Sequence, residues 1–209
     1  VRKPAALSVE EAAAIPAAGM SALQSLRDLG GLREGQRLLV NGAGGGIGVY
    51  AVQVGKLLGA HVTAVASAGK HELLAGLGAD ALLDYRKADF AKGRETWDVV
   101  FDVVPSRSFG ECARVLAPEG VYVTTLPGAG PFLASVGAAL RTPFGFKKRC
   151  RALMLKPRPE DLGWLLDRAA EGRLKAVVGK TAPLDQAAWA LSDLSAGHVT
   201  GKTVVRISA

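Results

Sequence analysis

The sequence predicts an α/β domain built on a doubly wound parallel sheet with helices on both faces. Short apolar strands alternate with helical segments along most of the chain, and a glycine cluster stands between the first strand and the next helix. The chain has 209 residues, 49% hydrophobic and 22% charged, which is ordinary for a compact domain and excludes intrinsic disorder. Alternating strands and helices of this kind form a parallel sheet that is covered on both faces.

The first 30 residues predict a helical lead-in segment. Residues 8–29 are rich in Ala and Leu, and Ser8 followed by a pair of glutamates is typical of a helix start. Pro16 lacks the N–H that a continuous helix needs, so we expect two helical pieces. The glycine pair Gly30-Gly31 predicts their end.

The middle of the chain predicts the sheet, as a domain over residues 31–180. Apolar runs bounded by Gly, Asp and Pro indicate strands, and apolar residues at helical spacing indicate the helices between them. The strands are expected at 37–40, 61–66, 81–84, 97–104, 120–125 and 152–155, and the helices at 46–58, 71–77, 108–116 and 159–171. Residues 128–151 have no clear period and predict a loop or partial helix. A strand at 176–178 precedes a C-terminal unit over 181–209, with a helix at 184–196 and a strand at 203–207.

Composition excludes several classes of protein. The longest nearly uncharged apolar stretch, 131–140, is about half of what a membrane span needs, and there is no secretion signal, so we expect a cytoplasmic protein. Cys112 and Cys150 have no Cys or His at ligand spacing, so neither a disulfide framework nor a zinc site is expected. The net charge of +7 is spread along the chain without an aromatic platform, so we expect no nucleic-acid partner. The chain begins at Val1 without an initiating methionine, and we expect it to be part of a longer protein.

The glycine cluster is the motif that carries chemistry. The segment NGAGGGIG follows the first strand and opens the next helix, and it reads A-x-G-x-x-G with Ala43 in the first glycine position. Small residues allow a tight turn and let the backbone approach a pyrophosphate at the positive end of a helix. The motif predicts a dinucleotide site formed by Asn41, Ala43, Gly45, Gly46, Ile47 and Gly48. Tight packing of a strand-to-helix turn is the structural alternative.

The end of the second strand favours NADPH over NADH. An NAD-binding protein usually has Asp or Glu there to accept from the ribose 2′-hydroxyl group, whereas this chain has Ser67. Ser67 can donate to a 2′-phosphate, and Lys70 can supply positive charge. The alternatives are that Ser67 caps a helix and that Lys70 is a solvated lysine.

Several stretches resemble the zinc-independent quinone oxidoreductase branch of the medium-chain dehydrogenase/reductase superfamily. They are residues 7–16, 35–40, 42–48, 77–80, 84–85 and 197–202. The resemblance implies that Ser67, Lys70 and Tyr85 surround the 2′-phosphate, that Gly45, Gly46 and Ile47 contact the pyrophosphate, and that Leu126 and Pro127 lie beside the nicotinamide ribose. Pro105 stands where the family often has Gly, so a backbone donor to the cofactor is lost there. The family's N-terminal GroES-like catalytic domain is mostly absent from this sequence, and the resemblance implies that residues 181–209 return toward it.

We therefore expect the NADPH-binding domain of a reductase that transfers hydride to a quinone or an α,β-unsaturated carbonyl without zinc. The alternatives are a non-catalytic NADPH-binding sensor or oligomerising module and an enoyl-thioester reductase. We expect a homodimer, and weak or no activity of this chain alone. No catalytic residue is assigned: Tyr50 is expected to be packed, Asp98 and Asp102 structural, the histidines at the surface or at caps, and the basic run 147–151 solvated.

Overall fold

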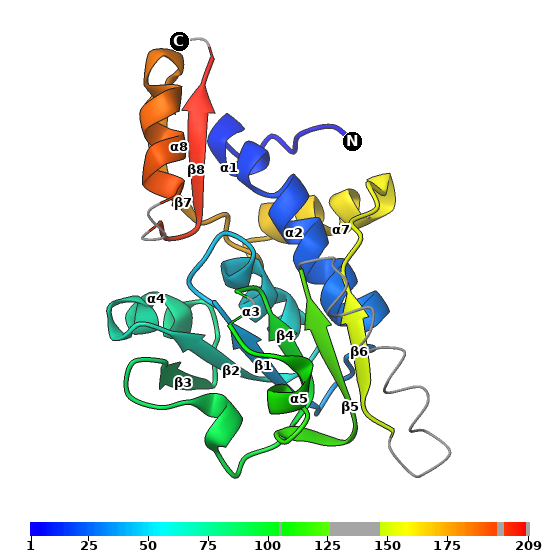
Figure 1. The fold of residues 1–209 in the computed structure, drawn as a ribbon. Helices are drawn as coiled ribbons and strands as arrows, with labels where there is room; N and C mark the ends of the chain where they lie inside the picture. Colours follow the sequence, from blue (N-terminus) through cyan, green and yellow to red (C-terminus); the bar gives the residue numbers. More distant parts are fainter. Residues whose placement is uncertain (105, 126–146, 196–198, 208–209) are drawn as a thin grey trace.

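A six-stranded parallel sheet forms the body of the protein (Figure 1). The computed structural model describes residues 1–104, 106–125, 147–195 and 199–207. The strands are β1 (Arg37–Asn41), β2 (His61–Ala66), β3 (Ala81–Asp84), β4 (Trp97–Asp102), β5 (Leu116–Thr124) and β6 (Arg149–Ala152). Their order, β3-β2-β1-β4-β5-β6, is that of a Rossmann fold, and it reverses direction between β1 and β4. The predicted α/β class, a doubly wound parallel sheet with helices on both faces, is confirmed, and the sheet is of the Rossmann type.

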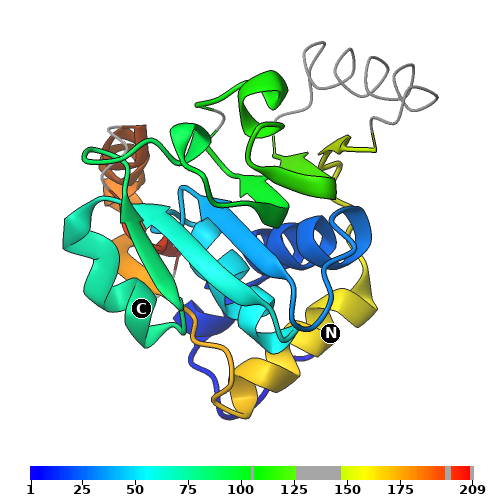
Figure 2. The same ribbon diagram turned by 90° about the horizontal axis from the view of Figure 1, so that it is seen from below.

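The four central strands, β1, β2, β4 and β5, are buried on both faces, so their alternate residues enter two separate cores. Leu38 and Val40 of β1 belong to the larger core, and Leu39 between them belongs to the smaller one. The larger core lies under α2 (Pro16–Leu23), α3 (Gly48–Leu57), α4 (His71–Gly76) and α7 (Pro159–Ala170). The smaller core lies under α5 (Phe109–Cys112) and the 3₁₀ turn η3 (Phe90–Lys92), and Figure 2 shows helices on both sides of the sheet.

The N-terminal segment is part of this body. Helix α1 (Val9–Ala14) begins at a capping box formed by Ser8 and Glu11, and Pro16 begins α2, as the predicted break requires. A π-helix, η1 (Gln24–Leu29), continues α2 to the predicted glycine pair. Helix α2 packs against α3 and α7, so residues 1–30 share the core of the sheet domain.

A second, smaller unit lies beyond one end of the sheet. Strand β7 (Val178–Pro183) pairs in parallel with β8 (Lys202–Arg206), and the turn η5 (Leu184–Gln186) leads into α8 (Ala187–Ser195). Helix α1 contacts both strands, and Figure 1 shows these elements together at the top. The expected boundary between residues 180 and 181 falls inside β7, because this strand extends five residues beyond the predicted 176–178.

Two predicted elements need correction. The helix expected at 108–116 begins where predicted, at a capping box of Ser108 and Glu111, but α5 ends at Cys112 because the chain must turn to enter β5 at Leu116. The strand expected at 152–155 is β6, three residues earlier, where Arg149 pairs with Val121. This strand ends the span predicted as a loop, and residues 126–146 of that span lie outside the described residues. Every helix in the described part of the chain is too short or too polar to cross a lipid bilayer.

Candidate functional site

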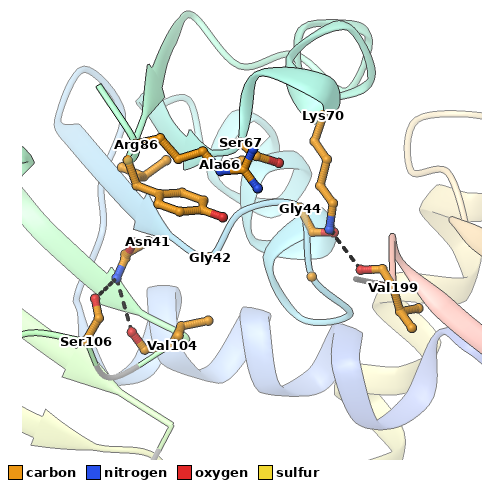
Figure 3. Close-up of a pocket in the computed structure, with 13 residues that line it drawn as sticks. Asn41, Gly42, Gly44, Ala66, Ser67, Lys70, Arg86, Val104, Ser106 and Val199 are labelled. Atoms are coloured by element: carbon orange, nitrogen blue, oxygen red, sulfur yellow. Dashed lines mark hydrogen bonds between the residues drawn. The ribbon is translucent and has the colours of Figure 1, made fainter. Parts of the chain in front are cut away.

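A cavity of about 440 Å³ opens at the carboxyl ends of β1, β2 and β4, where the strand order reverses (Figure 3). Ligands of open α/β sheets bind in this crevice, because the loops that leave the strands diverge there. The residues that line it are Asn41, Gly42, Gly44, Gly45, Val65, Ala66, Ser67, Lys70, Tyr85, Arg86, Val104, Ser106 and Val199. The topology therefore brings the glycine cluster, the end of β2 and the end of β3 into one site.

The glycines of the loop meet different surroundings. Gly42 has a φ of +79°, a backbone conformation that residues with a side chain rarely adopt. A Cβ on Gly48 would lie 2.2 Å from the carbonyl oxygen of Gly42, which is too close for any atom. A Cβ on Gly45 would meet only that oxygen, at 3.4 Å, which is an ordinary contact. The fold itself thus requires glycine at 42 and 48, whereas the protein has room for a side chain at Gly45, on the cavity wall.

The β2 side of the cavity is positively charged. Lys70 and Arg86 both line it, and no described lining residue is Asp or Glu. Lys70 Nζ donates to the carbonyl oxygen of Val199 at 2.9 Å and to that of Gly44 at 3.4 Å. Partial burial lowers the pKa of the Lys70 ammonium group, and Tyr85 acts in the opposite direction. Figure 3 shows Ser67, Lys70 and Arg86 along this side, so the cavity suits a ligand that is anionic there.

The opposite wall is held by a buried carboxylate. Asn41 Nδ2 donates to Asp102 Oδ1 at 2.8 Å, to the carbonyl oxygen of Val104 at 3.1 Å and to Ser106 Oγ at 3.1 Å. The Tyr122 hydroxyl donates to Asp102 Oδ2 at 3.0 Å. Burial of Asp102, whose side chain has no exposed surface, raises its pKa to about 6. This network ties the end of β4 and the loop after it to the start of the glycine loop.

The predicted site residues fall into three groups. Asn41, Gly45, Ser67, Lys70 and Tyr85 line the cavity together. Ala43 is buried behind the loop, and Gly46, Ile47 and Gly48 follow Gly45 into the start of α3 without lining the cavity. Pro105, Leu126 and Pro127 lie outside the described residues.

Sequence reasoning did not name several lining residues: Gly42, Gly44, Val65, Ala66, Val104 and Ser106, which neighbour predicted ones, and also Arg86 and Val199. Arg86 directly follows Tyr85. It could have been predicted, because a basic residue just after β3, the strand that pairs with β2, lies near the end of β2. Val199 comes from the far end of the chain, and no local pattern places it beside Gly44. Tyr50, expected to be packed, is fully buried in α3, and burial raises its pKa.

The described residues do not offer a metal site. They contain no group of three or more His, Cys, Asp or Glu side chains placed to hold a metal ion. Cys112 and Cys150 are both buried and form no disulfide with each other. Burial raises the pKa of the Cys112 thiol to about 12, which disfavours the thiolate that metal binding needs.

Comparison with known proteins identifies the family. Residues 77–205 match the family described as zinc-binding dehydrogenase. The chain is 35% identical over 216 residues to the chloroplast envelope quinone oxidoreductase homolog of Arabidopsis thaliana, covering 98% of this chain and 64% of that protein. It is 36% identical over 207 residues to 2-methylene-furan-3-one reductase of Solanum lycopersicum, covering 97% of this chain and 48% of that protein.

The solved structures include the quinone oxidoreductase from Coxiella burnetii, which superimposes with a TM-score of 0.87 at 27% sequence identity. That match covers all of this chain and 64% of the other, so the chain spans less than two thirds of the relatives it matches. The family match covers more than half of the chain, and the quinone oxidoreductase structure has the same fold. The chain belongs to the zinc-binding dehydrogenase family, within the medium-chain dehydrogenase/reductase superfamily that its sequence resembles.

Proposed function

We propose that the cavity binds NADPH and that this chain is the cofactor-binding domain of an oxidoreductase acting on a quinone or an α,β-unsaturated carbonyl. One observation carries the proposal: a glycine loop at the switch point of the sheet shares a cavity with Lys70 and Arg86, and no described carboxylate lines it. The printed names of the relatives, a quinone oxidoreductase homolog and a reductase of a methylene ketone, support the substrate class.

The two ends of the cavity suit different phosphates of the cofactor. Gly45, Gly46 and Ile47 stand at the start of α3, where the backbone can approach a pyrophosphate and the helix dipole favours negative charge. Ser67, Lys70, Tyr85 and Arg86 would hold the 2′-phosphate, and Lys70 would exchange its contact with Val199 for this group. The resemblance places Leu126 and Pro127 beside the nicotinamide ribose, and Pro105 at a position near the cofactor where no backbone donor is available; these three assignments stay predictions.

The cofactor supplies hydride, and the protein orients it and excludes water. The Asn41 side chain donates hydrogen bonds to Val104 and Ser106, which lie in the loop after β4. These bonds fix the cavity wall between the glycine loop and the loop after β4. No described residue is assigned as the proton donor, and the proposal takes the proton from water or from the rest of a longer protein. Zinc independence, the division into residues 1–30, 31–180 and 181–209, a cytoplasmic location and a homodimer remain predictions.

A fluorescence titration of this chain with NADPH and, separately, with NADH tests the cofactor assignment. We expect at least tenfold tighter binding of NADPH, which corresponds to about 1.4 kcal/mol. Equal affinities would refute the 2′-phosphate site. If neither dinucleotide bound, the glycine loop would be a packing turn and the proposal would fail.

Oxidation of NADPH by the longer protein tests the substrate class. We expect turnover with a quinone or an enone, and faster turnover of an acyl-thioester would favour the enoyl-thioester reductase instead. NADPH binding without turnover of any of these three classes would favour a non-catalytic sensor or oligomerising module.

A further inference from the structure

The side-chain amide of Asn41, at the end of β1, is held in one orientation by its acceptors. Its Nδ2 donates to Asp102 Oδ1 at 2.8 Å, and also to the carbonyl oxygen of Val104 and to Ser106 Oγ, both at 3.1 Å. A carboxylate and a carbonyl oxygen only accept hydrogen bonds, so the amide nitrogen must face them. Burial raises the pKa of Asp102 to about 6, so at pH 8 this group is a carboxylate and cannot donate to Asn41.

The other end of this amide, Asn41 Oδ1, faces the cavity. Asn41 lines the cavity, and no described residue donates a hydrogen bond to its Oδ1. Among the described side chains, the fully buried polar atoms without a partner are the hydroxyl oxygens of Ser25, Tyr50 and Thr203. Asn41 Oδ1 is not one of them, so a ligand can reach it. Figure 3 shows the amide nitrogen turned toward Ser106 and Val104, which leaves the oxygen on the other side of the planar amide as a free acceptor.

The two phosphate sites leave one part of the cavity for the adenine ring. Under the proposed function, the pyrophosphate lies at the glycine loop and the 2′-phosphate lies near Lys70 and Arg86. The remaining side chains that line the cavity at the ends of β1 and β2 and after β4 are Asn41, Val65, Ala66, Val104 and Ser106. Three of these are apolar and suit the faces of a flat aromatic ring. An edge of that ring would meet the polar groups of Asn41 and Ser106.

We propose that Asn41 is a specificity-determining residue, whose Oδ1 accepts a hydrogen bond from the exocyclic amino group of adenine. This inference rests on the proposed function and names the group of the cofactor that this wall recognises. A purine with a carbonyl oxygen in place of the amino group would bring two acceptors together. The Asn41 amide cannot turn round to donate to that oxygen, because its nitrogen would leave Asp102 and Val104. The site therefore selects adenine over hypoxanthine, which carries this carbonyl oxygen.

The experiment compares NADPH with its hypoxanthine analogue by fluorescence titration at pH 8. We expect the unmodified chain to bind the analogue about tenfold more weakly, because one hydrogen bond is lost and an acceptor is left facing another acceptor. N41S has no amide oxygen and should bind the two dinucleotides with nearly equal affinity. K70M should weaken both by the same factor and keep the discrimination, because Lys70 lies near the 2′-phosphate.

S106A is the matched control, because Ser106 belongs to the same wall and accepts from the same amide nitrogen. It should keep the discrimination, since Asp102 and Val104 still hold that nitrogen. The ratio of the two affinities is measured on one protein, so a partly unfolded sample does not disturb it, and N41A is a second variant if N41S does not fold.

Three results would overturn the inference. They are equal binding of the two dinucleotides by the unmodified chain, discrimination that N41S or N41A retains, and discrimination that S106A loses. If the unmodified chain bound neither dinucleotide, the proposed function would fail instead, so the two failures are distinguishable.

Discussion

Gly45 and Gly48 stand three residues apart in one loop, and alanine at each should separate cofactor binding from folding. A Cβ on Gly48 would lie 2.2 Å from the carbonyl oxygen of Gly42 and 2.6 Å from the Cα and carbonyl carbon of Ala43. These are backbone atoms, so G48A must displace the loop itself. Overpacking of this kind costs about 1–3 kcal/mol of folding free energy.

G45A should have the opposite profile. Its added methyl group would meet only the carbonyl oxygen of Gly42, at 3.4 Å, so the folded chain accommodates it. Gly45 does not have a positive φ, and alanine lowers the entropy of the unfolded chain, so stability should stay unchanged or rise by up to about 1 kcal/mol. The methyl group would stand where the backbone must approach the pyrophosphate, so we expect NADPH to bind at least about tenfold more weakly.

Urea unfolding and NADPH titration of G45A, G48A and a control measure both quantities. G76A is the matched control, because Gly76 ends α4 with nothing within 4 Å of its added Cβ and does not line the cavity. We expect G76A to bind NADPH as the unmodified chain does. Normal NADPH binding by G45A would show that the loop does not contact the cofactor. Unchanged stability of G48A would contradict the close contact between Gly48 and the backbone of Gly42.

Three other predictions address charge. K70M should weaken NADPH by about tenfold and leave NADH unchanged, because only the 2′-phosphate loses a partner; equal losses measured by titration would contradict this. S67D places a carboxylate at the end of β2 and should reverse the preference toward NADH in the same titration, whereas a retained NADPH preference would remove Ser67 from the 2′-phosphate site. Burial raises the pKa of Asp102 from 3.8 to about 6, so the folded state binds this proton more tightly than the unfolded state does. The resulting contribution to stability is present below pH 4 and is lost as the pH rises to about 6. Relative to D102N, the unmodified chain should lose about 2 kcal/mol of stability between pH 4 and pH 7 in urea unfolding, and parallel pH profiles would contradict the burial of this carboxylate.

The sheet could be predicted because β1, β2, β4 and β5 each contain an apolar run whose alternate residues enter the two cores, and because β3 is a short apolar run between turn residues. The edge strand β6 could not, since its sequence Arg-Cys-Arg-Ala buries only Cys150. The more apolar residues that follow it leave Met154 76% exposed and Leu155 39% exposed. The apolar residues there placed the strand three residues too late, because hydrophobicity does not show which residues an edge strand pairs with.

The candidate site was predictable where a motif carries it. The glycine loop and the end of β2 are local patterns with a fixed chemistry, so Asn41, Gly45 and Ser67 could be named in advance. Arg86 and Val199 reach the same cavity from the segment after β3 and the segment before β8, which tertiary packing brings to the glycine loop. No pattern in the neighbouring sequence indicates contacts of that kind.

The structure of this chain crystallised with NADPH tests the central claim most directly. We predict the pyrophosphate at Gly45, Gly46 and Ile47, and the 2′-phosphate between Lys70 and Arg86. Lys70 Nζ should have left the carbonyl oxygen of Val199 to reach that phosphate. NADPH bound elsewhere on the chain, or bound with its 2′-phosphate away from both cations, would contradict the account.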